Sequence, residues 1–187
     1  MKVFSTEIED VLEIVLDVHA DARGFLVETF HAERFARAGV EHRFVQDNAA
    51  RSRRGALRGL HFQGCPGQGK LIRVTRGAVF DVAVDVRAGS STFGRTVTRR
   101  LEEDDGRLLY LPPGFAHGYQ ALSDVVDLAY KLTSPYDPSE ERGLAWDDPA
   151  LAIPWPIQAP LLSERDQRWP RLDEIEPWSP TSQPASG

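Results

Sequence analysis

Residues 57–70, LRGLHFQGCPGQGK, place one histidine, His61, in an apolar segment that glycines interrupt. An imidazole between Leu60 and Phe62 is costly to bury unless a polar partner satisfies it. A hydrogen-bonded core histidine is the ordinary explanation for an isolated residue of this kind. Here the same segment carries several other polar side chains: Arg58, Gln63, Gln68 and Lys70. Their presence favours a polar pocket around His61.

The residue types available to this pocket suit the transfer of a proton. Histidine titrates near neutral pH, so His61 is a natural general base. A tyrosine such as Tyr130 is a weak acid that can return a proton from the other side, and a fixed cation such as Lys70 can stabilise a developing oxyanion. Together they describe proton abstraction beside a carbonyl with reprotonation on the opposite face, as in an epimerase or isomerase. The alternative, Tyr130 as a core tyrosine with a hydrogen-bonded hydroxyl, stays open.

His117 closes a second segment of interest, residues 112–117, with the sequence PPGFAH. Its PxGxxH pattern resembles the second motif of the cupin superfamily, and His61 stands where the first cupin motif would fall. Metal-binding cupins usually carry HxH followed by a glutamate there, whereas this chain has a single histidine. Two imidazoles beside the positive Lys70 make a poor site for a divalent cation. We therefore expect a pocket without a metal, and a metal-dependent cupin oxygenase or isomerase is the alternative.

The elements that must hold these residues are mostly short strands. Apolar residues alternate with polar ones over residues 80–87, where Phe80 and Val82 lie opposite Asp81, and again over 126–132, where Tyr130 lies opposite Lys131. Glycine- and proline-containing turns separate these strands. Many short strands with regular turns predict an all-β fold, an antiparallel sandwich or barrel of the jelly-roll kind with a few short helices.

The first third of the chain adds further elements. We expect strands over residues 11–17, 25–30 and 44–48, and a short helix over 31–38 that Gly39 ends. A basic cluster follows, formed by Arg51, Arg53 and Arg54. A solvated loop is the ordinary reading of such a cluster, and a local attractor for phosphate is the alternative.

The composition bounds the class of protein. At 187 residues, with 41% hydrophobic and 27% charged residues, the chain fits one ordinary globular domain, expected over residues 1–175. The Pro/Ser-rich end, residues 176–187, is expected to be a disordered tail. A net charge of −6 argues against a general nucleic-acid binder, and Cys65, the only cysteine, excludes an intrachain disulfide. With no signal peptide and no membrane-span pattern, we expect a cytoplasmic protein that binds neither nucleic acid nor membrane.

A series of segments in fixed order gives a more specific indication. The chain reads DARGFLVETF, FVQDN, LRGLHFQ, QGKLIRV, VFDVAVDVR, LPPGFAHGY, YKLTSPYDP, LAWDDPALAIPWP and LSERD. Short pieces such as VDVR are weak signals, but the ordered series resembles the dTDP-4-dehydrorhamnose 3,5-epimerase family across roughly residues 3 to 172. That resemblance implies a cupin-type jelly-roll homodimer that works without cofactor or metal on a dTDP-4-keto-6-deoxyhexose.

The resemblance also implies catalytic roles. His61 of LRGLHFQ would be the base that removes the protons beside the ketone, and Asp166 of LSERD would pair with it. Tyr130 of the YK pair would be the acid on the opposite face, and Lys70 of QGK would stabilise the enolate at the keto oxygen. The product would then be dTDP-4-dehydro-L-rhamnose, formed from dTDP-4-dehydro-6-deoxy-D-glucose by inversion at carbons 3 and 5.

Substrate contacts follow from the same resemblance. The matching positions are Arg23, Glu28, Gln46, Asp47, Asn48, Arg58, His117, Glu141 and Arg165. Within the family an early segment is shared between protomers, so Arg23 and Glu28 would serve the partner's site. Ala49-Ala50 after the QDN triad and Thr96 in place of a tryptophan depart from the family pattern. A mono-epimerase that inverts one carbon and a non-catalytic nucleotide-sugar-binding cupin are therefore kept as alternatives.

Overall fold

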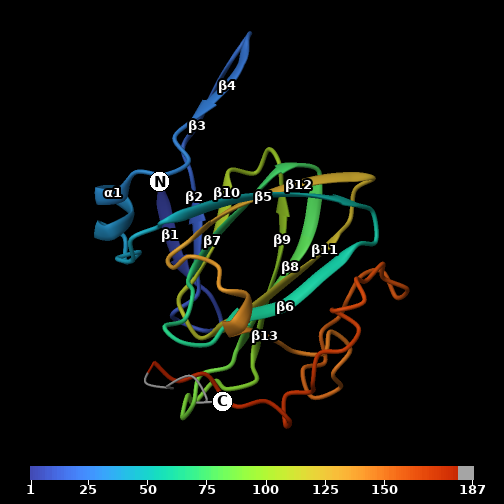
Figure 1. Ribbon diagram of the computed structural model, residues 1–187. Helices are drawn as coiled ribbons and strands as arrows, with labels where there is room; N and C mark the ends of the chain where they lie inside the picture. The colour runs from blue at the N-terminus through green and yellow to red at the C-terminus, as the bar shows by residue number, and fades with distance from the viewer. Residues whose placement is uncertain (181–187) are drawn as a thin grey trace.

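Two antiparallel sheets pack face to face in the computed structural model, which describes residues 1–180 (Figure 1). One sheet has the strand order β1 (Lys2–Ser5), β2 (Leu12–Val15), β10 (Arg107–Leu111), β7 (Lys70–Arg76), β12 (Val125–Leu132) and β5 (Gln46–Arg53). The other has the order β13 (Glu141–Gly143), β6 (Leu57–Gln63), β11 (Phe115–Ala121), β8 (Ala78–Asp85) and β9 (Thr96–Glu102). This sandwich confirms the predicted all-β jelly-roll class.

The space between the sheets holds one apolar cluster. Val126 and Leu128 of β12 point into it from the six-stranded sheet, and Val79 and Ala83 of β8 meet them from the other side. All four side chains are almost completely buried. Burying an aliphatic side chain of this size contributes about 1.5–3 kcal/mol, so this layer holds the two walls of the sandwich together. The alternation predicted over residues 126–132 is confirmed.

Strand β8 also alternates as predicted, but its polar face is the inner one. Asp81 is fully buried inside the sandwich, whereas Val82 and Val84 point to the outer side of the five-stranded sheet. That outer side is apolar because the C-terminal segment, residues 144–178, covers it. The most buried large residues of this covering layer are Leu144, Leu151 and Trp155.

Ordered structure continues past the predicted domain boundary at residue 175. The indole nitrogen of Trp178 donates a hydrogen bond to the carbonyl of Gly64 at 2.7 Å, and its backbone forms an isolated parallel bridge with Arg87, just beyond β8. The apolar ring of Trp178, in the Pro/Ser-rich segment, thus packs on the core, and the domain boundary at residue 175 stays a prediction. The predicted disorder of residues 181–187 lies outside the described residues.

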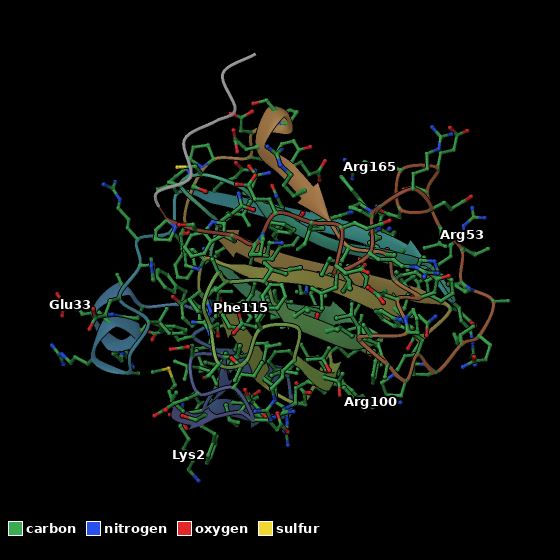
Figure 2. All side chains as sticks on the ribbon, turned by 90° about the horizontal axis from the view of Figure 1, so that it is seen from below. Lys2, Glu33, Arg53, Arg100, Phe115 and Arg165 are labelled. Atoms are coloured by element: carbon green, nitrogen blue, oxygen red, sulfur yellow. The ribbon has the colours of Figure 1, made fainter. Side chains whose placement is uncertain are left out.

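On the opposite side, helix α1 (Ala32–Arg37) covers the outer face of the six-stranded sheet. Phe35 is its only buried residue and packs with Leu71 and Leu108 of that sheet. Gly39, at φ +95°, follows the end of the helix as the sequence predicts. In Figure 2, Glu33 of α1 and Arg165 of the C-terminal segment lie on opposite sides of the molecule.

The hairpin of β3 (Val18–Asp21) and β4 (Gly24–Val27) stands clear of the two sheets (Figure 1). Phe25 and Leu26 near its tip are 59% and 75% exposed. The hairpin therefore presents an apolar tip at the surface of the chain.

Strand β5 extends further than the sequence indicates. The QDN triad opens this strand instead of ending it, and Arg51 and Arg53 belong to the strand, so the predicted loop is wrong for these two residues. Ser52 is buried between them because side chains alternate along a strand. Arg51 points outward and pairs with Asp127 of β12 at 2.6 Å.

A short 3₁₀ turn, Pro138–Glu140, precedes β13.

Candidate active site

A cavity of about 580 Å³ opens into the sandwich between strands of both sheets and the C-terminal segment. It brings together most of the residues that the sequence singled out. These are His61, Lys70, Tyr130 and Asp166, together with Gln46, Asn48, Arg58, His117, Glu141 and Arg165. They come from β5, β6, β7, β11, β12 and β13 and from the coil that carries Arg165, which Figure 2 labels.

His61 and Asp166 form a hydrogen-bonded pair on one wall of this cavity. The Nε2 atom of His61 lies 2.6 Å from Oδ1 of Asp166, whose side chain is 4% exposed. Burial acts to raise the pKa of Asp166, but its interaction with His61 and its hydrogen bonds with Ser163 and Trp169 together outweigh burial, so this pKa is lowered. An ionised carboxylate accepts the Nε2 proton. The lone pair of His61 is therefore on Nδ1, which is the form that a general base needs.

The backbone around His61 is shaped by an unusually close approach of two strands. His61 lies opposite His117 of β11, with a register shift just beyond that pair. At the shift Gly59 has φ +117°, and a Cβ there would lie 2.5 Å from the Cα of Gly118. Only glycine fits at both positions, because each strand occupies the space that the other's side chain would need. The glycine of LRGLH thus sets how His61 enters the cavity.

Lys70 is the first residue of β7, at the end of the glycine-interrupted segment. Its Nζ atom donates a hydrogen bond to the carbonyl of His61 at 2.8 Å, and the residue is 7% exposed. Burial lowers its pKa from 10.5 to about 8, although the charges of Asp81 and Glu141 favour the protonated form. Two protons of the ammonium group remain for another oxygen at the cavity wall.

Tyr130 lies across the cavity from this group. It belongs to β12 in the six-stranded sheet, where it pairs with Asn48 of β5 and Ile72 of β7. His61 belongs to β6 in the five-stranded sheet. The imidazole and the phenol therefore enter one cavity from opposite walls, which is the arrangement that abstraction and return of a proton on opposite faces requires.

Three further pairs hold the polar wall. His117 binds the fully buried carboxylate of Asp81 through Nε2 at 2.9 Å, and Arg165 binds Glu141. The guanidinium of Arg58 is held by Ser52, with Nε donating to Oγ at 3.0 Å. Because these partners hold the side chains in place, a ligand in the cavity would bind them with little loss of side-chain freedom.

Sequence reasoning missed several residues that shape this wall. They are Ser52, Asp81, Tyr119, Tyr136, Ser163 and Trp169. The sequence identifies Asp81 only as a polar residue of β8. Its hydrogen bond to His117 forms because that face of the strand points into the sandwich. Tyr119 shares an inward-facing edge with His117 two residues earlier, a spacing that period-2 alternation could have flagged. The ring of Tyr136 lies at the cavity mouth, 43% exposed, and its hydroxyl donates to Glu141 at 2.9 Å.

The remaining predicted contacts lie elsewhere in the molecule. Arg23 and Glu28 sit on or beside the projecting hairpin, bound to Asp21 and Arg34 respectively. Asp47 points to the outer side of β5, where it binds Lys131 at 2.9 Å. Strand alternation explains that placement, since its neighbours Gln46 and Asn48 both face the cavity.

Among residues 1–180, no group of three or more histidine, cysteine, aspartate or glutamate side chains gathers in a way that would hold a metal ion. Across the same residues, none of the helices has the length and apolar character needed to cross a membrane.

Comparison with known proteins adds independent evidence. The sequence profile of dTDP-4-dehydrorhamnose 3,5-epimerase matches residues 5–174. The dTDP-4-dehydrorhamnose 3,5-epimerase of Pseudomonas aeruginosa is 48% identical over 170 residues, covering 90% of this chain and 94% of that protein. A dTDP-4-dehydrorhamnose 3-epimerase of Streptomyces niveus is 46% identical over 162 residues, covering 86% of this chain and 78% of that protein.

The same similarity extends to the fold. The crystal structure of a dTDP-6-deoxy-D-glucose-3,5-epimerase from Legionella pneumophila, in complex with dTDP-4-keto-L-rhamnose, matches with a TM-score of 0.91. That protein is 44% identical, and the match covers 94% of each chain. The sequence, the fold and the residues that line the cavity all indicate the same family. The chain belongs to the dTDP-4-dehydrorhamnose 3,5-epimerase family, and it is an isomerase.

Proposed function

We propose that this protein inverts carbons 3 and 5 of dTDP-4-dehydro-6-deoxy-D-glucose and so forms dTDP-4-dehydro-L-rhamnose. One observation carries the chemistry: a His61–Asp166 pair and Tyr130 enter the same cavity from opposite sheets. The substrate follows from the family to which the chain belongs.

In the proposed mechanism His61 removes the proton of a carbon next to the ketone. The C–H electron pair forms the carbon–carbon double bond of an enolate, and the carbonyl electrons move to its oxygen. Lys70, a buried cation with free N–H groups, stabilises that oxyanion at the moment it forms. Tyr130 then delivers its hydroxyl proton to the opposite face of the same carbon, and the enolate returns to the ketone.

Asp166 supports the charged form of His61 after proton abstraction. Its buried, ionised carboxylate accepts a hydrogen bond from Nε2 of His61 throughout. When Nδ1 takes up the substrate proton, the resulting imidazolium therefore stays paired with a negative charge. The step needs no redox change. His61 gains the proton that leaves one face and Tyr130 loses the proton that arrives on the other, so proton exchange with solvent must restore both groups before the second carbon is inverted.

The diphosphate and the nucleoside are held by local groups, because the chain as a whole has a charge of −6. Arg58 and Arg165 line the cavity, and the planar guanidinium suits the oxygens of a phosphate. The exposed ring of Tyr136 at the mouth is placed to stack on a nucleobase. Gln46 and Asn48, which are hydrogen-bonded to each other at 3.1 Å, offer further amide groups.

We also propose that the active protein is a homodimer. The hairpin of β3 and β4 exposes Phe25 and Leu26 and carries Arg23 away from its own cavity. Insertion of the hairpin into a second copy would bury that apolar tip and bring Arg23 and Glu28 to the partner's site.

A nucleotide-sugar substrate and the free cysteine Cys65 both suit a reducing cytoplasm, where we place the protein.

Solvent exchange tests the reaction directly. Incubation with dTDP-4-dehydro-6-deoxy-D-glucose in deuterated water should introduce deuterium at carbons 3 and 5, which nuclear magnetic resonance can assign. Tight binding without exchange at either carbon would contradict the proposal and indicate a binding protein. Exchange and inversion at carbon 3 alone would support a second candidate, the 3-epimerase activity named for the relative from Streptomyces niveus.

A further inference from the structure

One carboxylate oxygen of Asp166 accepts hydrogen bonds from two rings. Oδ1 lies 2.6 Å from Nε2 of His61 and also accepts a hydrogen bond from the indole nitrogen of Trp169 at 3.3 Å. The carboxylate is therefore held from two directions. Its backbone is fixed as well, because the amide of Asp166 donates to the hydroxyl of Ser163 at 3.1 Å.

Trp169 also contacts the base itself. Its ring centroid lies 5.7 Å from that of His61, with the two planes at 68°, an edge-to-face arrangement that aromatic rings favour. The next residue along the chain, Pro170, accepts a backbone hydrogen bond from Ala145 at 2.8 Å. The indole is therefore anchored to the same wall as His61.

Gly143 makes room for this indole. It lies directly opposite His61 in the pairing of β13 with β6, and a Cβ at residue 143 would fall 2.4 Å from the Trp169 ring. The side-chain space at Gly143 is thus occupied by Trp169. Backbone, carboxylate and imidazole form a single packed unit around the indole.

We propose that Trp169 is a positioning residue: it fixes the Asp166 carboxylate and, through it, the orientation and tautomer of His61. The inference rests on the proposed function to the extent that His61 is the base. Trp169 need not touch the substrate to act in this way, and it is absent from the lining of the cavity. Its role is to keep the Nδ1 lone pair of His61 aimed at the reacting carbon, where small misplacements are costly.

The other ionisable groups near this unit have partners of their own. Lys70 donates to the His61 carbonyl, His117 binds Asp81, and Arg165 binds Glu141. Tyr130 faces the unit from the other sheet. None of these bonds involves the indole, so a change at Trp169 acts first on Asp166 and His61.

Trp169→Phe is the decisive variant, because it keeps an aromatic ring and removes only the N–H donor. Loss of one hydrogen bond to a carboxylate should lower kcat about 5-fold. KM should change less than kcat, since the contacts with substrate remain. The acidic limb of the pH profile of kcat/KM should move to higher pH, because a carboxylate relieved of one donor holds the imidazolium more strongly. Trp169→His, which keeps a ring N–H, should recover part of the lost kcat.

Trp155→Phe is the matched control. Trp155 donates its indole N–H to the carbonyl of Trp146 at 2.8 Å, away from the cavity. This control should lower the melting temperature and leave kcat and the pH profile unchanged. A Trp169→Phe enzyme with unaltered kcat and pH profile would overturn the proposal, as would an equal effect of the control.

A readout without turnover separates this inference from the proposed function. The Nε2 proton of His61, shared with a carboxylate at 2.6 Å, should give a downfield proton resonance in the ligand-free protein. That resonance should shift or broaden in Trp169→Phe and stay in place in Trp155→Phe. An unchanged resonance in both would contradict the positioning role. If wild-type protein showed no deuterium exchange at all, the proposed function would fail while this measurement still tested the coupling of Trp169 to His61.

Discussion

The cavity and the β3–β4 hairpin both carry residues expected to meet one substrate, yet they are built in opposite ways. Asp166 and Lys70 in the cavity are 4% and 7% exposed and already hydrogen-bonded. Arg23 on the hairpin has a side chain that is 89% exposed and, among residues 1–180, pairs with Asp21 alone. The groups proposed to perform the chemistry are preorganised within one chain, whereas the proposed contacts on the hairpin are exposed to solvent in it. Preorganisation lowers the cost of reaching the transition state.

The largest effect should come from removing the base. His61→Asn keeps a polar side chain of similar reach but no longer accepts a substrate proton at neutral pH. Since general-base catalysis contributes on the order of 100- to 10,000-fold, kcat should fall to the lower limit of detection. Retention of more than about a tenth of the activity would reduce His61 to a contact residue, and circular dichroism would confirm that the variant is folded.

Lys70→Gln should follow in size. Removing one group that stabilises an oxyanion typically lowers kcat about 100- to 1,000-fold. Its interaction with the keto oxygen grows as the enolate forms, so kcat should fall by more than KM rises. Because the pKa of Lys70 is about 8, wild-type kcat should also decline as the pH rises through that value. Unchanged kcat with a greatly raised KM would move Lys70 to the diphosphate.

Tyr130→Phe separates the two halves of the reaction. It removes the hydroxyl that delivers the proton while leaving His61 able to abstract one. Epimerisation should slow by roughly 100-fold, within the range for a general acid, and deuterium exchange at the same carbons should slow less. Equal loss of both would mean that Tyr130 orients the sugar and does not protonate it.

The smallest effect on chemistry is expected at the hairpin. Arg23→Ala should raise KM about tenfold, in line with the loss of a charge-assisted hydrogen bond, and leave kcat nearly unchanged. If Arg23→Ala raised KM by the same factor in a protein that sedimentation shows to be monomeric, Arg23 would have to act in the site of its own chain.

Co-expression of two defective variants sharpens the comparison further. If each site combines His61 of one protomer with Arg23 of the other, a heterodimer of His61→Asn and Arg23→Ala contains one intact site. With statistical pairing in a two-fold dimer, about a quarter of the sites should have wild-type KM. If Arg23 served its own chain, that fraction would be absent, because every site would then carry one of the two defects.

Much of the fold could be predicted because its signals are local. Alternation in β8 and β12 and the turns between strands follow from the nearest few residues, and so does the end of α1 at Gly39. The resemblance to the family supplied the pair His61 and Asp166, which are 105 positions apart. No local pattern links residues at that separation.

The remainder depends on which side of a strand faces the core. Asp81 is inside because the C-terminal segment covers the opposite, apolar face of β8, and nothing near residue 81 announces that cover. Trp169 was missed for the same reason, since its partners Gly143 and His61 lie on other strands. The Pro/Ser-rich composition around Trp178 gives no sign that its aromatic ring packs on the core.

The buried ammonium group of Lys70 also bears on the stability of the folded protein. An unfolded lysine keeps its proton up to about pH 10.5, whereas the folded chain releases it near pH 8. The unfolded state therefore binds more protons between these values, and the free energy of unfolding should rise with pH across that interval. Below pH 8 the folded protein bears the full cost of the buried charge, on the order of 3 kcal/mol. A Lys70→Met variant should accordingly melt at a higher temperature than the wild-type protein at neutral pH, so the residue proposed to stabilise the enolate makes the fold less stable.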